Sequence, residues 1–230
     1  MTRPWETLFH HATAHGVLSA IALPEDPAPV PATVLERLDP AEQELAVTMR
    51  GYRQVQFVGG RIALRLASAQ LGIPLPASLP DDRGTPRLPP KLAGSVSHKQ
   101  DIAVGMVARH GGATLGVDIE NYRPERMSVL PKVLRPEELA AIEALPEQDR
   151  WLAALLRFSI KESIYKAIDP YVRRYVGFQE ALVVPDLEGR AMVTMFLERD
   201  EGPFAIDARY LWLEGRLLTS VRIRPQQPPD

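Results

Sequence analysis

Apolar residues recur with a helical period in four stretches of the chain. The helices predicted from this period cover residues 41–49, 61–71, 136–145 and 148–168. Pro136 suits the first turn of the third helix, where the N–H that proline lacks has no partner in any case. Asp169-Pro170 is expected to end the fourth helix, because proline disfavours a continuing helix. Helices are therefore expected in both halves of the chain.

Strands are predicted where apolar and β-branched residues run between turn signals. Residues 102–107 and 114–120 flank His110-Gly111-Gly112 and predict a β-hairpin. Three further runs, at 191–197, 204–213 and 216–223, predict a meander whose last turn is Glu214-Gly215. Helix followed by strands thus occurs once before Glu120 and once after it. The pattern predicts an α+β protein of two halves, with domains at 1–113 and 114–230.

Composition narrows the class of protein. The 230 residues are 45% hydrophobic and 24% charged, and the formal net charge is -2, as expected of a globular domain rather than a nucleic-acid-coating protein. The chain has no Cys, which excludes disulfides and thiolate chemistry. The apolar stretch 16–23 is too short for a membrane span and has no basic segment before it, so a cytoplasmic protein without membrane partners is expected.

Prolines mark the irregular segments. Their number, 22, is well above the usual share of roughly 5%. They cluster at 24–31, 74–90 and 225–229, which we interpret as two connectors and a tail.

Two carboxylates stand side by side at the end of the predicted strand 114–120. Because strand side chains alternate between faces, Asp118 and Glu120 point the same way and Ile119 points the other way. Such a pair is compatible with an exposed strand end. It is also a candidate for binding a cation that compensates the two like charges.

A third acidic candidate lies on the predicted helix 148–168. Glu162 sits between Lys161 and Lys166, and with Lys166 it can form an ordinary surface ion pair four residues apart. The alternative is that Glu162 joins Asp118 and Glu120 as a ligand. Three carboxylates without a thiolate suit a hard cation such as Mg²⁺, with the two lysines as phosphate partners nearby.

Basic residues in the first half suit an anionic ligand. Arg61 follows Gly59-Gly60 at the predicted start of a helix, a position that favours an anion. Arg53 precedes it, and His98 follows Ser97 on the loop or first strand of the sheet expected to carry Asp118. Taken singly, such residues are more often structural or surface residues than ligands.

Five sequence blocks follow one another along the chain: Arg53 to Arg61, Gly84-Thr85-Pro86-Arg87, Ser95-Val96-Ser97-His98, Gly116-Val117-Asp118-Ile119-Glu120 and Lys161-Glu162-Ser163-Ile164-Tyr165-Lys166. In this order they resemble the 4'-phosphopantetheinyl transferases of the larger, pseudo-dimeric bacterial class, similar to those that serve surfactin, siderophore and polyketide synthases. They span roughly residues 53 to 170. The resemblance implies two similar α/β lobes related by pseudo-twofold symmetry, with the active site at their interface.

The resemblance also implies the ligands and their residues. It implies Mg²⁺ or Mn²⁺ on Asp118, Glu120 and Glu162, and coenzyme A as co-substrate. The coenzyme A contacts it implies are Arg53, Arg61, Ser97 and His98 around the 3'-phosphate, Pro86 and Arg87 near the adenine, and Lys161 and Lys166 on the other phosphates.

The reaction implied is transfer of 4'-phosphopantetheine from coenzyme A to a serine of an apo acyl or peptidyl carrier protein, with release of 3',5'-ADP. Glu162 is the candidate base and Lys166 the residue nearest the leaving group. A metal-dependent nuclease and a non-catalytic module that binds coenzyme A or carrier proteins are the alternatives; the acidic balance of the chain disfavours nucleic acid as a partner.

Arg123 to Arg135 is a candidate docking surface for the carrier protein. It combines Arg126 and Lys132 with apolar residues, and carrier proteins are typically acidic around the modified serine. A solvated loop whose apolar residues pack inward explains the same pattern. Since the two predicted lobes lie in one chain, a monomer is expected.

Overall fold

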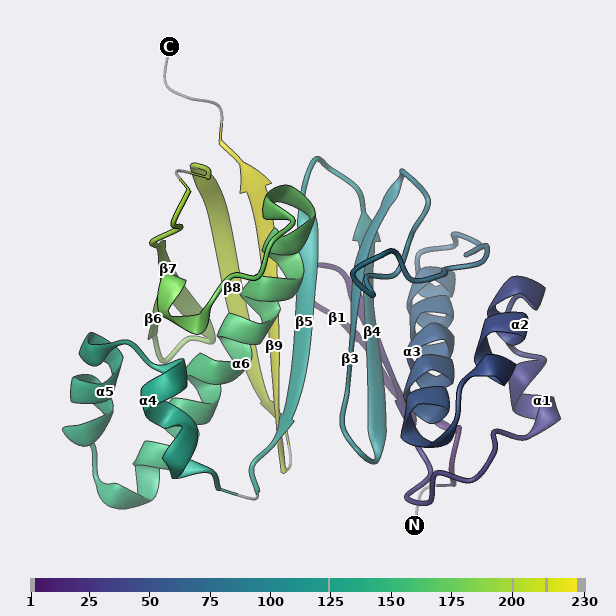
Figure 1. Ribbon diagram of the computed structural model, residues 1–230, viewed down its shortest axis with the longest axis horizontal. Helices are drawn as coiled ribbons and strands as arrows, with labels where there is room; N and C mark the ends of the chain where they lie inside the picture. Colours follow the sequence, from purple (N-terminus) through teal and green to yellow (C-terminus); the bar gives the residue numbers. More distant parts are fainter. Residues whose placement is uncertain (1–2, 124, 200, 214, 227–230) are drawn as a thin grey trace. The chain divides into compact units, whose positions relative to one another are not determined.

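The computed structural model describes residues 3–123, 125–199, 201–213 and 215–226. These residues form two compact units, Met1–Gly111 and Gly112–Asp230. Each unit consists of one antiparallel sheet with one long helix packed on it, as Figure 1 shows. The predicted α+β class with two similar α/β lobes is therefore confirmed.

The first unit is a four-stranded sheet covered by helix α3. Its elements are β1 (Thr7–Ala12), β2 (Val17–Ala22), α1 (Ala32–Leu35), α2 (Pro40–Thr48), α3 (Gly51–Gln70), β3 (Leu92–His98) and β4 (Ile102–Arg109). The strand order is β1-β2-β4-β3, and all neighbours are antiparallel. Helix α3 packs on β2, β3 and β4 and buries Val55, Val58 and Ile62 in the core.

Helix α3 begins ten residues earlier than the sequence pattern indicates. Gly59 and Gly60 lie inside it rather than before it. A Cβ on Gly59 would come within 2.4 Å of Leu23 Cδ2, so a glycine here allows the helix to pack closely on its neighbours. Arg61 therefore lies in the middle of α3, and the expectation that it stands at a helix N-terminus is wrong.

The second unit is a five-stranded sheet covered by helix α6. Its elements are β5 (Thr114–Asn121), η1 (Met127–Val129), α4 (Leu130–Val133), α5 (Pro136–Glu143), α6 (Glu147–Val172), η2 (Phe178–Glu180), β6 (Ala181–Pro185), β7 (Arg190–Met195), β8 (Phe204–Leu213) and β9 (Arg216–Pro225). The strand order is β5-β9-β8-β7-β6. Helix α6 packs mainly on β5 and β9 and buries Ile160, Ile164 and Ile168 (Figure 1).

The hairpin predicted around His110-Gly111-Gly112 is wrong. Strand β4 pairs with β2 and β3, whereas β5 pairs with β9 from the end of the chain, so the two strands belong to different sheets. His98, at the end of β3, is consequently not on the sheet that carries Asp118. Alternating residues identify a strand but not its partner, which is why this local prediction failed.

The other predicted elements of the second half are present. Strands β7, β8 and β9 form the meander, although Glu214 of its last turn lies outside the described residues. Helix α6 continues through Pro170 to Val172, so the expectation that Asp169-Pro170 ends it is wrong. Its C-cap residue is Arg173, whose φ of 47° is left-handed. Strands β1, β2, β3 and β6 were not predicted. No helix of the described ranges is both long and apolar enough to cross a membrane.

Two glycines at the contact of α3 with its sheet should respond oppositely to substitution by alanine. A Cβ on Gly105 would lie 2.5 Å from the Leu64 backbone nitrogen, so Gly105→Ala should lower the free energy of unfolding by about 1–3 kcal/mol. A Cβ on Gly60 meets nothing closer than Val96 Cγ1 at 3.6 Å. Gly60→Ala should therefore raise the free energy of unfolding by roughly 0.5–1 kcal/mol, because alanine has the higher helix propensity. Urea unfolding measures both; equal effects would contradict this packing.

Candidate active site

The carboxylate of Asp118 is one of the buried polar groups of the second unit. Asp118 lies on β5 and is 4% exposed as a residue. Lys166 Nζ lies 2.9 Å from Oδ1 and also donates to the Val117 carbonyl at 2.8 Å, while the Ser159 hydroxyl donates to Oδ2 at 2.8 Å. Both carboxylate oxygens are thus bonded to groups of α6, and one of these groups is a cation.

Close packing of α6 on β5 makes these contacts possible. Gly116 lies two residues before Asp118, on the same strand face. A Cβ there would approach the Ser163 carbonyl oxygen to 1.8 Å, which no real structure permits. The glycine of the Gly-Val-Asp-Ile-Glu block therefore lets the helix backbone come near enough for short side chains to reach Asp118.

The other two acidic candidates occupy neighbouring positions. Glu120 follows Asp118 on the same strand face, and Glu162 lies on α6 between Ser159 and Lys166, the two residues that contact Asp118. Both side chains are partly exposed. No three His, Asp or Glu side chains of the described residues are grouped closely enough to hold a metal ion. The structure therefore joins Asp118 to Lys166 and leaves the predicted triad adjacent rather than assembled.

The ammonium of Lys161, for which a phosphate contact is expected, is bonded to internal partners of this unit. Its Nζ donates to Glu138 Oε2 at 2.6 Å, to the Val133 carbonyl at 2.9 Å and to the Phe178 carbonyl at 3.0 Å. An ammonium has three hydrogens, so none is left for a ligand. Burial lowers the pKa of Lys161, and the bond to Glu138 opposes that shift.

Arg61 is the most unusual cation of the first unit. It is 4% exposed, its guanidinium carbon lies 4.6 Å from the centre of the Phe57 ring, and its Nε has no hydrogen-bond partner among the described residues. Burial lowers its pKa to about 10, a shift that Glu42 opposes, so the side chain stays charged at neutral pH. A buried cation with an unused donor is suited to an anionic ligand.

The remaining first-unit candidates lie on α3, on β3 and on the segment between them. Arg53 is exposed on α3, and Ser97 and His98 end β3, with Ser97 buried and His98 exposed. A Cβ on Gly60 would contact Val96, so the Arg61 turn of α3 lies beside the end of β3. Pro86 is buried where its segment bridges to Pro80, and Arg87 is exposed next to it.

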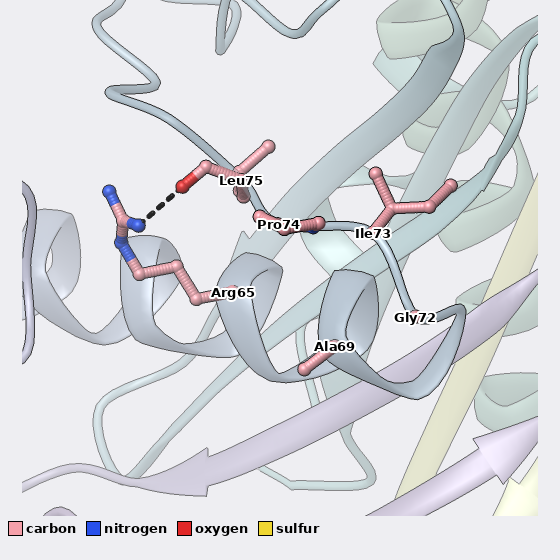
Figure 2. A pocket seen from close by; sticks show the side chains of 6 residues that line it. All are labelled: Arg65, Ala69, Gly72, Ile73, Pro74 and Leu75. Atoms are coloured by element: carbon pink, nitrogen blue, oxygen red, sulfur yellow. Dashed lines mark hydrogen bonds between the residues drawn. The ribbon is translucent and has the colours of Figure 1, made fainter.

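A separate hollow of about 390 Å³ lies at the C-terminal end of α3 (Figure 2). It is lined by Arg65, Ala69, Gly72, Ile73, Pro74 and Leu75. The Arg65 guanidinium is committed to internal partners, since it donates to the Leu75 carbonyl at 2.6 Å and to Glu42 Oε2 at 2.6 Å. The hollow includes none of the predicted site residues.

The candidate docking segment divides its apolar residues between core and solvent. Leu130 and Val133 are buried, whereas Met127 and Val129 are 43% and 41% exposed beside Arg126 and Lys132. Arg135 instead donates to the Gln179 carbonyl and stacks on Phe196. Two apolar residues therefore anchor the segment, and an exposed basic and apolar surface remains. Position 124 lies outside the described residues.

Sequence reasoning missed three residues around these sites. Ser159 contacts Asp118, Thr219 contacts Ser159, and Glu138 holds Lys161. Ser159 and Ser163 are spaced four apart on the side of α6 that carries Lys166, a signal the sequence does contain. Thr219 shows no such signal, because only the pairing of β5 with β9 sets it opposite Asp118.

Comparison with known proteins gives the class of this enzyme. Residues 114–215 match the model of the 4'-phosphopantetheinyl transferase superfamily, and residues 41–108 match that of the 4'-phosphopantetheinyl transferase N-terminal domain. The chain is therefore a transferase of the type with both domains.

Individual relatives agree. The chain is 30% identical over 204 residues to 4'-phosphopantetheinyl transferase Npt of Nocardia iowensis, covering 79% of this chain and 87% of Npt. It is 29% identical to 4'-phosphopantetheinyl transferase PptT of Mycobacterium tuberculosis, and the match covers 80% of this chain and 79% of PptT. It is 31% identical to 4'-phosphopantetheinyl transferase Svp of Streptomyces mobaraensis, and that match covers 70% of this chain and 65% of Svp. The chain belongs to the 4'-phosphopantetheinyl transferase family, which leaves the nuclease alternative without support.

Replacing Lys161 tests its structural role. Lys161→Met leaves the Glu138 carboxylate buried without its cation, so the free energy of unfolding should fall by about 3–5 kcal/mol. Arg209→Gln, which removes a partly exposed ion pair to Asp207, should cost at most about 1 kcal/mol and serves as the control. The KM of the folded Lys161→Met variant for coenzyme A should stay within about twofold of the wild-type value. A raised KM with unchanged stability would instead identify a phosphate ligand.

Proposed function

We propose that this transferase moves 4'-phosphopantetheine from coenzyme A to a serine of an apo acyl or peptidyl carrier protein. The serine oxygen forms a bond to the β-phosphorus, the bond from that phosphorus to the bridging oxygen breaks, and 3',5'-ADP leaves with the electron pair. The observation that carries this proposal is the contact of Asp118 with Lys166, flanked by Glu120 and Glu162, in a chain of this family.

The acidic residues are chemically suited to a divalent cation. Asp118, Glu120 and Glu162 offer carboxylate oxygens, the donors that Mg²⁺ and Mn²⁺ prefer, and Asp118 Oδ1 already attracts the Lys166 ammonium. These three residues would hold the metal, which when bound neutralises the negative charge of the coenzyme A pyrophosphate. Two of these carboxylates lie on one strand face, which supports this proposal.

The chain's own groups then supply positioning and proton transfer. Lys166 is 26% exposed at its side chain and can donate to a phosphate oxygen on the leaving side. Glu162, partly exposed on the same helix face, accepts the proton of the attacking serine hydroxyl. Lys161 joins α6 to α5 through its bond to Glu138, and it has no direct contact with the substrate.

Residues of the first unit recognise the other end of coenzyme A. Arg61 and Arg53 on α3, with Ser97 and His98 at the end of β3, bind the 3'-phosphate, while Pro86 and Arg87 adjoin the adenine. The buried, unused Nε of Arg61 is the strongest support for this assignment. In this proposal residues 1–113 bind that end and residues 114–230 carry metal binding and catalysis, so a monomer acting in the cytoplasm suffices.

The carrier protein docks on the exposed part of the segment after β5. Met127 and Val129 offer apolar contacts, and Arg126 and Lys132 complement the acidic surface of a carrier.

Charge reversal by Lys132→Glu should slow carrier modification more than the same change at exposed Lys91 in the first unit. Equal rates for the two variants would argue for a different docking surface.

Intact-protein mass spectrometry tests the reaction itself. Apo carrier proteins incubated with the enzyme, coenzyme A and Mg²⁺ should gain one phosphopantetheine each, and EDTA should prevent the gain. Glu162→Gln should abolish this gain while retaining coenzyme A binding, because the amide cannot accept the serine proton. Metal-independent transfer, or full activity of Glu162→Gln, would overturn the roles assigned here.

Loss of the Arg61 charge should mainly weaken binding of the 3'-phosphate of coenzyme A. A hydrogen bond to a charged group contributes about 1.5–3 kcal/mol, so Arg61→Gln should raise the KM for coenzyme A roughly 10- to 100-fold. The KM for dephospho-coenzyme A, which lacks that phosphate, should change far less. Equal rises for both substrates would mean that Arg61 acts through the fold, and a thermal unfolding scan of the variant would show it.

A further inference from the structure

Three buried hydroxyl groups lie beneath Asp118, between α6 and the sheet. Ser159 and Ser163 of α6 and Thr219 of β9 are all 0% exposed. Thr219 is the direct cross-strand neighbour of Asp118 in the β5–β9 pairing. The three hydroxyls therefore lie where the strand pair meets the helix, at the position of the carboxylate.

Hydrogen bonds join these hydroxyls to Asp118 and to one another. Each hydroxyl can donate once. Ser159 donates to Asp118 Oδ2 at 2.8 Å, since an ionised carboxylate only accepts. Thr219 donates to the Ser159 carbonyl at 2.9 Å. Its hydroxyl oxygen also lies 3.0 Å from the Ser159 hydroxyl and 2.7 Å from the Ser163 hydroxyl, and in each of these two contacts either hydroxyl can be the donor. Thr219 thus ties the Ser159 backbone to the sheet, and Ser159 in turn orients the carboxylate.

The two oxygens of Asp118 consequently have different surroundings. Oδ2 faces the hydroxyl of Ser159, while Oδ1 faces the partly exposed ammonium of Lys166 at 2.9 Å. Fixing Oδ2 from inside leaves Oδ1 directed toward a cation. All three hydroxyls are buried, so the hydrogen bond to Oδ2 lies in surroundings of low dielectric, where it is electrostatically stronger than in water.

We propose that Ser159 and Thr219 are positioning residues, which orient the Asp118 carboxylate and so set the affinity of this site for a divalent cation. The inference rests on the proposed metal role of Asp118. Groups that hold a metal ligand in place commonly contribute 10- to 100-fold in metal affinity. Gly116 belongs to the same arrangement, since it permits the approach of α6 that brings these hydroxyls into reach.

Direct titration of Mn²⁺ tests the inference independently of turnover. Unbound Mn²⁺ is followed by its electron paramagnetic resonance signal in the presence of coenzyme A. Ser159→Ala and Thr219→Val should raise the dissociation constant for Mn²⁺ about 10- to 100-fold. Thr219→Ser keeps the hydroxyl and should restore most of the affinity. Turnover of the variants should recover at saturating Mn²⁺, with the KM for the carrier unchanged.

A matched control removes a buried serine hydroxyl elsewhere. Ser68 donates to the Ile73 carbonyl at 2.6 Å in the first unit, and Ser68→Ala should leave Mn²⁺ affinity unchanged. Normal Mn²⁺ affinity in both Ser159→Ala and Thr219→Val would overturn the positioning role and leave the proposed function standing. Wild-type protein that transfers phosphopantetheine yet binds no Mn²⁺ would overturn the metal role and this inference together. Should Ser159→Ala fail to fold, the comparison of Thr219→Val with Thr219→Ser decides the question.

Discussion

A carboxylate removed from water must find a positive charge and hydrogen-bond donors, and the Asp118 side chain imposes this requirement on the second unit. Lys166 supplies the charge and Ser159 supplies a donor, both from α6. The helix must therefore approach β5 closely, which Gly116 allows. The close approach of α6 and the orientation of the buried carboxylate both follow from satisfying this one group.

Buried charges elsewhere in the protein hold connecting segments in the same way. Glu138 accepts from Lys161, from the Arg135 backbone N–H and from the Val183 backbone N–H, so α5, α6 and β6 meet at one carboxylate. In the first unit Glu42 accepts from Arg65 and from the Ser78 backbone N–H, which holds the proline-rich segment against the helices. The difference at Asp118 is exposure: its cation is partly accessible, whereas Lys161 and Glu138 are sealed. We infer that the partly accessible Asp118–Lys166 pair serves chemistry and that the sealed Lys161–Glu138 pair serves the fold.

Periodicity in the sequence was enough to predict the long helix α6, the α2 and α5 helices and the β7–β9 meander, since each depends on neighbouring residues. It failed for the pairing of β5, because the partner strand lies at the far end of the chain and alternation carries no information about it. It also misplaced the start of α3, because two consecutive glycines resemble a break until the packing against Leu23 is known. For the site, the blocks around Asp118 and Glu162 predicted their shared surroundings, but Lys161 and Lys166 are equivalent in sequence and opposite in burial. Thr219 could be found only from the sheet register.

The central claim is that the Asp118 carboxylate is the charge that recruits the divalent cation. Isothermal titration of Mn²⁺ into wild-type protein and Asp118→Asn tests it most directly, because the amide keeps the size of the side chain and removes its charge. We predict stoichiometric binding by the wild type and loss of that binding in Asp118→Asn, with cooperative unfolding retained in both. Undiminished Mn²⁺ binding by folded Asp118→Asn would contradict the account.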